Sequence, residues 1–317
     1  MIDIYGECKD IIPKNAVAIH NILNNKGFDT YFVGGALRDF YINVIRSQDN
    51  KIKDWDIVTT ARHEDMKRLF NKILRINENG RIVSKVGKTE LLIASLETTG
   101  ISLNNQIFEV TPMNKIVDGE VDFTLNIVED LRKRDFTINT IAYSPKLGII
   151  TSFEDSEGNY IDSIRDIKEG IIRSTYEPDE AFRRNRFNMV RAIMFANRFD
   201  FKIEGNTFEA LKNNIELVRD INKGKISIAF EKIILSKVSE KIKYLKTSGL
   251  LNSICEGWND EYSDVFLDLI VNINRNYSEL DYVSRLRHIL NNFENKELIL
   301  NLYKSFGVNK EYLFKIM

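Results

Sequence analysis

Proline is confined to the first part of the chain, and this distribution constrains the fold of the rest. The four prolines are Pro13, Pro112, Pro145 and Pro178, and none follows. Amphipathic segments with apolar residues at helical spacing fill the proline-free part, at residues 182–197, 208–218, 226–246, 262–274, 282–290 and 297–306. Because proline breaks helix interiors and nothing interrupts these periods, we predict that the second half is all-helical.

The first half carries shorter segments of both kinds. Helical spacing over residues 15–26 stops at Gly27, a residue type that commonly ends helices. Further helices are predicted at 36–45, 63–70 and 129–143, and strands at 30–33, 55–59, 81–86, 91–96 and 106–111. The pattern predicts an α/β N-terminal part with a small mixed sheet, and it changes after about Gly170.

Length, charge and cysteine content limit the class of protein. A chain of 317 residues is long enough for two or three domains. The net charge of −1 gives no global field, so a nucleic-acid surface would have to be local. Cys8 and Cys255 form no disulfide framework and no Cys/His cluster has zinc spacing, which favours a reducing cytoplasm. The N-terminus lacks the apolar core of a signal peptide, and no window is apolar enough to span a membrane.

The sharpest local signal is a double glycine followed by an acidic pair. Gly34 and Gly35 stand between a predicted strand and a predicted helix that carries Arg38, and Asp54 and Asp56 follow after a linker. Glycines and a helix N-terminus let a phosphate approach the backbone, and arginine adds a bidentate clamp. Alternate residues of a strand project together, so the two carboxylates favour a divalent cation such as Mg2+. Taken singly, such patterns are more often a turn and a charged surface; together they favour a metal–NTP site.

These residues and several later segments resemble one family. YFVGGALRDF…DWDIVTTA resembles the first motif of the bacterial and eukaryotic tRNA CCA-adding enzymes and bacterial poly(A) polymerases, which are nucleotidyltransferases related to DNA polymerase β. DLRKRDFTIN at 130–139 is close to the family's DLxRRDFTINA. Weaker similarities lie at 160–173, resembling the strand pair after the head, at 182–196 and at 243–251. The resemblance covers about residues 28–251 in the family's order.

The resemblance implies an architecture and a reaction. It implies a nucleotidyltransferase head (1–145), a neck with the nucleotide-base pocket (146–205) and a helical body that binds RNA (206–317). The implied reaction is attack of an RNA 3′-hydroxyl on the α-phosphate of an NTP, CTP or ATP, with two Mg2+ ions. The acceptor is expected to be tRNA. A poly(A)-polymerase-like enzyme with another RNA acceptor and an inactive RNA-binding relative stay as alternatives, and the sequence leaves the oligomeric state open.

Site roles follow residue by residue from the resemblance. Asp54 and Asp56 would be the metal ligands. Glu109 would be the third carboxylate, supporting or deprotonating the 3′-hydroxyl, or else a solvent-facing strand residue. The residues expected to bind the nucleotide are Gly34, Gly35, Arg38, Arg134, Asp135 and Asn139, with Asp39 orienting Arg38. A lysine, arginine and aspartate in a row on a helix could otherwise form an exposed ion-pair face.

The sequence departs from the family at the base-selecting motif. The family's EDxxR uses an aspartate and an arginine on the base edge, whereas this chain has Arg184, Asn185 and Asn188 at the aligned positions. Amides can still contact a base edge, without charge assistance. Arg191 stays in place for phosphate contact or for the neck.

The second departure is a short segment between Thr111 and Val121, where the family has a longer arginine-bearing loop. Asn114 stands at the arginine position, and relatives that add only CC have a shortened loop. GKIS at 224–227 replaces the family's ERxxEE. Either function is preserved by compensation, or nucleotide or acceptor choice is altered, or catalysis is lost.

Two basic stretches are candidates for RNA phosphate contact. Arginines crowd residues 183–198 among phenylalanines, and lysines recur over 223–246. Each stretch is either a phosphate track or a solvated helix face.

Overall fold

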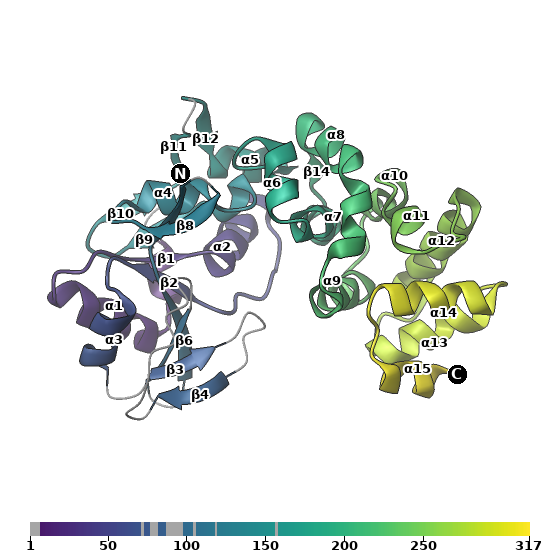
Figure 1. The fold of residues 1–317 in the computed structure, drawn as a ribbon, viewed down its shortest axis with the longest axis horizontal. Helices are drawn as coiled ribbons and strands as arrows, with labels where there is room; N and C mark the ends of the chain where they lie inside the picture. The colour runs from purple at the N-terminus through teal and green to yellow at the C-terminus, as the bar shows by residue number, and fades with distance from the viewer. Residues whose placement is uncertain are drawn as a thin grey trace. The chain divides into compact units, whose positions relative to one another are not determined.

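The computed structural model describes residues 7–70, 73–76, 82–86, 98–103, 106–117, 119–155 and 158–317 (Figure 1). The chain forms two compact units, of which the first ends at Glu169 and the second begins at Gly170. This division falls where the sequence pattern changes. None of the described helices has both the length and the apolar composition that a membrane crossing requires.

The first unit mixes helices and strands. Its elements are, in chain order, η1 (Glu7–Ile11), α1 (Lys14–Asn25), β1 (Thr30–Val33), α2 (Gly35–Arg46), β2 (Asp56–Thr59), α3 (His63–Leu69), β3 (Ile73–Ile76), β4 (Ile82–Val86), β5 (Thr99–Leu103), β6 (Gln106–Pro112), β7 (Asn114–Val117), β8 (Glu120–Phe123), α4 (Ile127–Arg132), η2 (Thr137–Asn139), β9 (Ala142–Ser144), β10 (Gly148–Ile150), β11 (Ser152–Glu154), β12 (Tyr160–Asp162) and α5 (Ser163–Glu169).

One eight-stranded sheet organises this unit, in the order β10-β9-β1-β2-β6-β5-β3-β4. Only β2 and β6 pair in parallel; the other neighbours are antiparallel. The expected mixed sheet is therefore confirmed. All four residues of β1 are buried, the polar Thr30 together with Tyr31, Phe32 and Val33, which fits a strand inside the sheet with both faces covered.

Helix α2 places the candidate nucleotide-binding residues against the interior. Ala36, Leu37, Phe40 and Tyr41 are buried, and the helix packs on β1, η2 and α5. Because residues three and four apart share a helix face, this packing also turns Arg38 inward. Arg38 is 6% exposed in consequence.

The helix predicted at 129–143 is wrong over most of its length. Asn126 caps α4, accepting a hydrogen bond from the backbone N–H of Val128 at 2.9 Å, and α4 stops at Arg132. Asp135 then accepts from the N–H of Phe136, an alternative to helical bonding. Ala142 continues into β9, which pairs with β1, so sheet pairing overrides the local helical pattern.

Other first-unit predictions hold in part. The strand predicted at 55–59 begins only at Asp56, and the one at 106–111 runs to Pro112. Of the strand predicted at 81–86, the described part is β4, and the strand predicted at 91–96 lies outside the described residues. The segments 160–162 and 171–172 are strands, but each pairs with another partner, β12 with β11 and β13 with β14.

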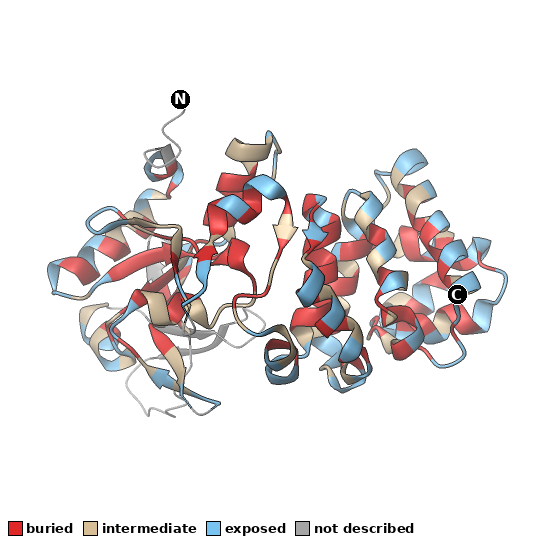
Figure 2. Ribbon diagram, turned by 90° about the horizontal axis from the view of Figure 1, so that it is seen from above, coloured by how far each residue is buried: buried red, intermediate tan, exposed pale blue. Residues whose placement is uncertain are grey.

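The second unit is helical apart from one two-residue strand pair. Its elements are β13 (Ile171–Ile172), α6 (Pro178–Arg184), α7 (Phe187–Phe199), β14 (Lys202–Ile203), α8 (Gly205–Asn213), η3 (Ile215–Asp220), α9 (Lys223–Leu235), η4 (Glu240–Lys243), α10 (Tyr244–Thr247), α11 (Leu250–Ile254), α12 (Asp260–Asn276), α13 (Tyr282–Asn292), α14 (Lys296–Ser305) and α15 (Lys310–Ile316). Figure 2 shows buried residues on the faces along which these helices pack. The expected helical second half is confirmed.

Asparagine and aspartate side chains fix the starts of several helices, which the spacing of apolar residues did not define. Side chains of Asn222, Asn259, Asp281, Asn295 and Asn309 accept backbone hydrogen bonds at the starts of α9, α12, α13, α14 and α15. The helix predicted at 182–197 is divided in the same way. Asn185 ends α6 and accepts from the N–H of Phe187, where α7 begins.

Candidate active site

The turn between β1 and α2 brings the backbone against an acidic strand. Gly34, which precedes α2, has a φ of 81°, a region that residues with a β-carbon rarely adopt. A β-carbon on Gly34 would lie 2.6 Å from Oδ2 of Asp56. Glycine is therefore required here both by its dihedral angle and by the close approach of Asp56.

Asp54 and Asp56 reach the site in different ways. Asp56 opens β2 and pairs in register with Val33, whereas Asp54 precedes the strand and has a left-handed φ of 53°. The expectation that both project from one strand is therefore wrong. Asp54 comes from the bend before β2, a conformation that aspartate tolerates better than most residues. Its negative charge still contributes to raising the pKa of Asp56.

Glu109 joins the pair from the neighbouring strand. β6 runs parallel to β2 with Ile57 opposite Val110, so Glu109 occupies the register position beside Asp56. Burial raises the pKa of Glu109, and the charge of Asp54 adds to this rise. Glu109 is thus half-buried beside two other carboxylates, which argues against a purely solvent-facing strand residue.

The three carboxylates repel one another. Burial and then the charge of Glu109 raise the pKa of Asp56 to about 7. The charge of Asp54 acts in the same direction, while Arg134 and Arg38 partly offset the rise. A cation placed among these side chains would relieve both the burial cost and the repulsion.

The donor set suits a hard divalent ion such as Mg2+. Carboxylate oxygens are its preferred ligands, and it takes the remaining ones from water and phosphate, so two protein carboxylates are enough. Among the described residues, no group of three or more His, Cys, Asp or Glu side chains is gathered closely enough to hold an ion by itself. The fit therefore depends on the charge of the cluster and on the approach of Asp56 to the glycine turn.

Arg38 is held by protein oxygens on two sides. Its Nε and Nη2 donate to Oδ1 of Asp39 at 2.8 and 2.7 Å, and its Nη1 donates to Oδ1 of Asn139 at 2.8 Å. The structure thus brings Arg38 and Asn139, which the resemblance assigned to the nucleotide, together with Asp39. The orienting contact expected of Asp39 is present. The buried guanidinium, however, is directed at protein groups rather than presented openly to a phosphate.

Asn139 also links Arg38 to the motif at 130–139. Nδ2 of Asn139 donates to Oδ1 of Asp135 at 2.8 Å, and the same oxygen accepts from the N–H of Phe136. Thr137, in η2, donates at 2.6 Å to the buried carboxylate of Asp166 in α5. The 3-10 turn is therefore fixed from both ends, which sets the side-chain positions of Asp135 and Asn139.

Asp130 is a residue of this region that the sequence analysis missed. It is fully buried, and its carboxylate accepts from Lys133 at 2.7 Å and from Arg134 at 2.9 Å. Burial alone would raise the pKa of Asp130, but the charges of Arg134 and Lys133 outweigh it and the pKa is lowered. The signal was in the sequence, since an acid three and four residues before two bases is a helical ion-pair spacing.

A β-hairpin occupies the short segment after Thr111. β7 and β8 pair from Asn114 opposite Phe123 to Val117 opposite Glu120. The N–H of Asn114 donates to Oδ1 of Asp130, and Lys133 donates to its side-chain oxygen. Asn114 therefore ties the hairpin to α4.

The three remaining predicted residues belong to the second unit. Asn185 ends α6 and is exposed, whereas Asn188 lies in the first turn of α7 with 5% exposure. The guanidinium of Arg191 lies 5.0 Å from the centre of the Phe195 ring, a cation–π contact. The two amides thus lie on either side of the start of α7, Asn185 exposed and Asn188 buried.

Comparison with known proteins finds one family. Residues 30–173 match the poly(A) polymerase head domain. The CCA-adding enzyme of Ligilactobacillus salivarius is 31% identical over 255 residues, covering 80% of this chain and 57% of the relative. That of Pediococcus pentosaceus is 30% identical over 254 residues, covering 80% and 58%. The chain thus spans little more than half the length of these relatives.

Solved structures agree on the fold. The Thermotoga maritima CCA-adding enzyme complexed with tRNA has a TM-score of 0.64 at 21% identity, with 96% of this chain and 69% of that chain covered. The Bacillus stearothermophilus enzyme in complex with CTP has a TM-score of 0.55 at 22% identity, with 96% and 80% covered. At this identity the similarity supports the shared fold.

Proposed function

This chain belongs to the family of CCA-adding enzymes and poly(A) polymerases, and from that premise we propose that it transfers nucleotides from NTP to the 3′ end of RNA without a template. The observation that carries the proposal is the cluster of Asp54, Asp56 and Glu109 beside the glycine turn. Asp56 and Glu109 are partly buried and Asp54 is exposed, and repulsion among such carboxylates is costly in a protein that has no use for it. It is useful where a divalent ion and a triphosphate must be held.

Asp54 and Asp56 would hold Mg2+, which when bound lowers the pKa of the attacking hydroxyl and neutralises the leaving pyrophosphate. Glu109 would accept or orient the proton of the RNA 3′-hydroxyl. Gly34 and Gly35 would let the triphosphate approach the backbone at the start of α2. Arg38 would act from its fixed place between Asp39 and Asn139.

Arg134 and Asp135 would contact the phosphate and ribose of the incoming nucleotide, with Asn139 assisting through Asp135. Asn185 and Asn188 would face the base, and Arg191 would contact phosphate or support the neck. On this proposal the chain has a head over 1–145, a neck over 146–205 and an RNA-binding body over 206–317. It would act in the cytoplasm.

The acceptor we favour is tRNA, because the relatives named above are CCA-adding enzymes. CTP and ATP would be the substrates. Two observations favour an altered outcome, such as partial CCA addition, another nucleotide or another acceptor. By the resemblance, amides stand at the positions of the family's charged base-edge pair, and the hairpin held by Asn114 stands where the family's loop is longer.

The test is 3′-end extension of total RNA with each labelled NTP in turn, in Mg2+, followed by sequencing of the labelled ends. We expect incorporation of CTP and ATP on tRNAs that lack their 3′ ends. Incorporation of another nucleotide, or labelling of intact RNA, would favour the altered enzyme.

A matched variant, Asp54→Asn with Asp56→Asn, separates catalysis from binding. It removes both charges while keeping the size of the side chains, so extension should stop while RNA binding continues. Mg2+ should raise the melting temperature of the unaltered chain and leave that of the variant unchanged. Extension by the variant at the original rate would contradict the proposed site. No extension by either protein would favour an RNA-binding relative without turnover.

A further inference from the structure

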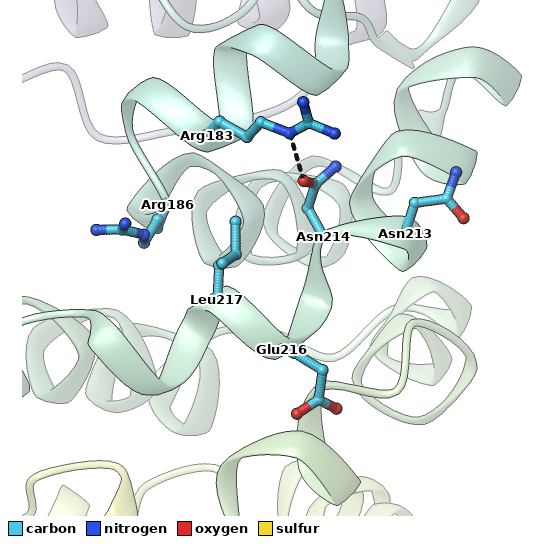
Figure 3. Close-up of a pocket in the computed structure, with 6 residues that line it drawn as sticks. All are labelled: Arg183, Arg186, Asn213, Asn214, Glu216 and Leu217. Atoms are coloured by element: carbon cyan, nitrogen blue, oxygen red, sulfur yellow. Dashed lines mark hydrogen bonds between the residues drawn. The ribbon is translucent and has the colours of Figure 1, made fainter.

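The second unit contains an open pocket outside the site described above. Its volume is about 430 Å3, within the range of roughly 300–1,000 Å3 that small-molecule sites occupy. Residues from the end of α6, the α6–α7 connection, the end of α8 and η3 line it: Arg183, Arg186, Asn213, Asn214, Glu216 and Leu217 (Figure 3).

The contacts of Arg183 orient its guanidinium but leave most of the side chain exposed. Its Nε donates to Oδ1 of Asn214 at 3.3 Å. Asn214 is itself buried and fixed, since its Nδ2 donates to Asp179 and to the carbonyl of Ala210. The ion pair of Arg183 with Asp179 is long, at 3.9 Å, and the arginine side chain is 70% exposed. A buried amide thus aims a guanidinium whose outer edge faces solvent.

Arg186 lies on the other side of the pocket. Its Nε is 3.7 Å from Oδ2 of Asp220, and both side chains are about half exposed. Such a pair contributes little binding energy in water. An anion from a ligand could therefore compete with Asp220 for this guanidinium.

Glu216, the one carboxylate among the residues that line the pocket, is directed elsewhere. Its Oε1 accepts from Ser253 at 2.6 Å and its Oε2 lies 3.0 Å from Arg219. Figure 3 shows the carboxylate pointing away from Leu217 and from both arginines. The pocket keeps a net positive lining in consequence.

The arrangement fits two anionic groups with an apolar body between them. In Figure 3 the guanidinium groups of Arg183 and Arg186 point in opposite directions, and Leu217 points toward the segment between them. In a single strand one phosphate precedes and one follows each nucleoside, so each arginine would meet a separate phosphate. A free nucleotide carries its phosphates at one end and would engage a single arginine.

We infer that this pocket binds one nucleotide unit of single-stranded RNA, with a phosphate on each arginine and the nucleoside against Leu217. Asn213 and Asn214 supply amide groups for the sugar or base edge. The inference rests on the proposed RNA partner and adds a binding site away from the carboxylate cluster. Phosphate contacts of this kind position RNA without reading its sequence.

The experiment is fluorescence anisotropy of a 3′-labelled single-stranded oligoribonucleotide with the full chain, in the absence of NTP. Arg183→Ala and Arg186→Ala should each weaken binding on the order of threefold, and the double variant on the order of tenfold. Each single-strand phosphate contact contributes about 0.7 to the salt slope, so the double variant should lower the slope by about 1.4. Arg68→Ala, an exposed arginine on α3 of the first unit, is the charge-matched control and should change neither quantity.

Circular dichroism and melting of each variant show whether the fold is intact. Unchanged RNA affinity in the double variant would overturn the pocket while leaving the proposed function standing. Loss of affinity for free AMP or CMP instead of RNA would assign the pocket to a mononucleotide and also overturn the inference. If the unaltered chain binds no RNA, the proposed function fails, and the inference fails with it.

Discussion

Nη1 of Arg38 donates a 2.8 Å hydrogen bond to Oδ1 of Asn139, which lies 101 positions farther along the chain. Asn139 in turn donates to Asp135, so a buried amide joins helix α2 to the motif at 130–139, which begins in α4. This one contact fixes two groups of proposed nucleotide-binding residues relative to each other. A change at Asn139 should therefore disturb both.

Asn139→Leu removes both hydrogen bonds at nearly constant volume. It leaves the buried Arg38 short of an acceptor, at a cost of about 1–3 kcal/mol in the free energy of unfolding. Nucleotide addition should fall more steeply than stability, because Arg38 and Asp135 lose their fixed positions. Urea unfolding and extension kinetics measure the two effects. Asn206→Leu, on the exposed start of α8, is the control, and equal losses in both variants would argue against the linking role.

Gly34 should be irreplaceable where another positive-φ glycine is not. Gly34→Ala meets both a φ of 81° and Oδ2 of Asp56 at 2.6 Å, whereas Gly158→Ala meets only a φ of 85° with open space around it. The second change should cost about 1–2 kcal/mol of backbone strain. The first should cost more and abolish nucleotide addition, since Asp56 must shift. Comparable activity in the two variants would show that the close approach is dispensable.

Two ion pairs of similar geometry should contribute differently to the free energy of unfolding, because one is buried and the other is exposed. Arg134 lies 2.9 Å from the fully buried Asp130, and Arg165 lies 3.0 Å from the exposed Glu169, both at i,i+4 spacing. Asp130→Asn leaves two cations without their counter-charge and should cost about 3–5 kcal/mol. Glu169→Gln should cost at most about 0.5 kcal/mol. Thermal and urea unfolding give the comparison, and similar losses would mean that Asp130 is better solvated than its contacts indicate.

His20 should make the first unit sensitive to mild acid. It is 1% exposed, stacks on Phe32 with ring centres 5.3 Å apart, and lies 2.9 Å from Oγ of Ser144. Burial lowers the pKa of His20 below its usual value. The unfolded chain therefore binds a proton that the folded chain rejects, so the stabilisation is present above about pH 6.5 and is lost as pH falls below it.

As pH falls from the pKa of His20 in the unfolded chain to its pKa in the folded chain, the contribution of His20 to the free energy of unfolding should decline by up to about 1.4 kcal/mol per pH unit. Urea titrations from pH 8 to pH 5 measure the slope. His20→Phe keeps the stacking surface and should flatten this part of the curve. An unchanged slope in that variant would assign the acid sensitivity to other residues.

The sequence predicted those parts of the fold in which local pattern and packing agree. Residues 30–33 are a strand in both, and the amphipathic segments of the second half are helices. The prediction failed where the secondary structure depends on pairing with a residue far away in the chain. Ala142, for example, lies in a segment with a helical pattern but pairs with β1. The prediction that Asp54 projects from the same strand as Asp56 failed for another reason, because residue spacing does not reveal a left-handed backbone bend.

The site shows the same division. Clustering of Glu109 with the aspartates depends on parallel pairing of β2 with β6, which only the family resemblance could suggest. The family resemblance could not predict that Arg38 is buried between Asp39 and Asn139. A resemblance indicates which residues matter, but not which atoms they contact. Asp130 was within reach, since its spacing to Lys133 and Arg134 is a local signal.

Restoring charge at the start of α7 should sharpen nucleotide choice. Asn185→Asp with Asn188→Arg reinstates the aspartate and arginine of the family's EDxxR, and charge-assisted hydrogen bonds are roughly twice as strong as neutral ones. Discrimination of CTP and ATP against UTP and GTP should rise by about tenfold, which corresponds to about 1.4 kcal/mol. Competitive incorporation with all four NTPs measures it.

Asn188 is 5% exposed, so an arginine there must displace its neighbours, and Asn185→Asp alone provides the variant that leaves packing intact. The single change should favour bases with an amino group on the contacted edge, because a carboxylate only accepts hydrogen bonds whereas an amide does both. If neither variant changes the ratio of incorporated nucleotides, the base is selected elsewhere. The residues 185 and 188 would then serve the helix start rather than the substrate.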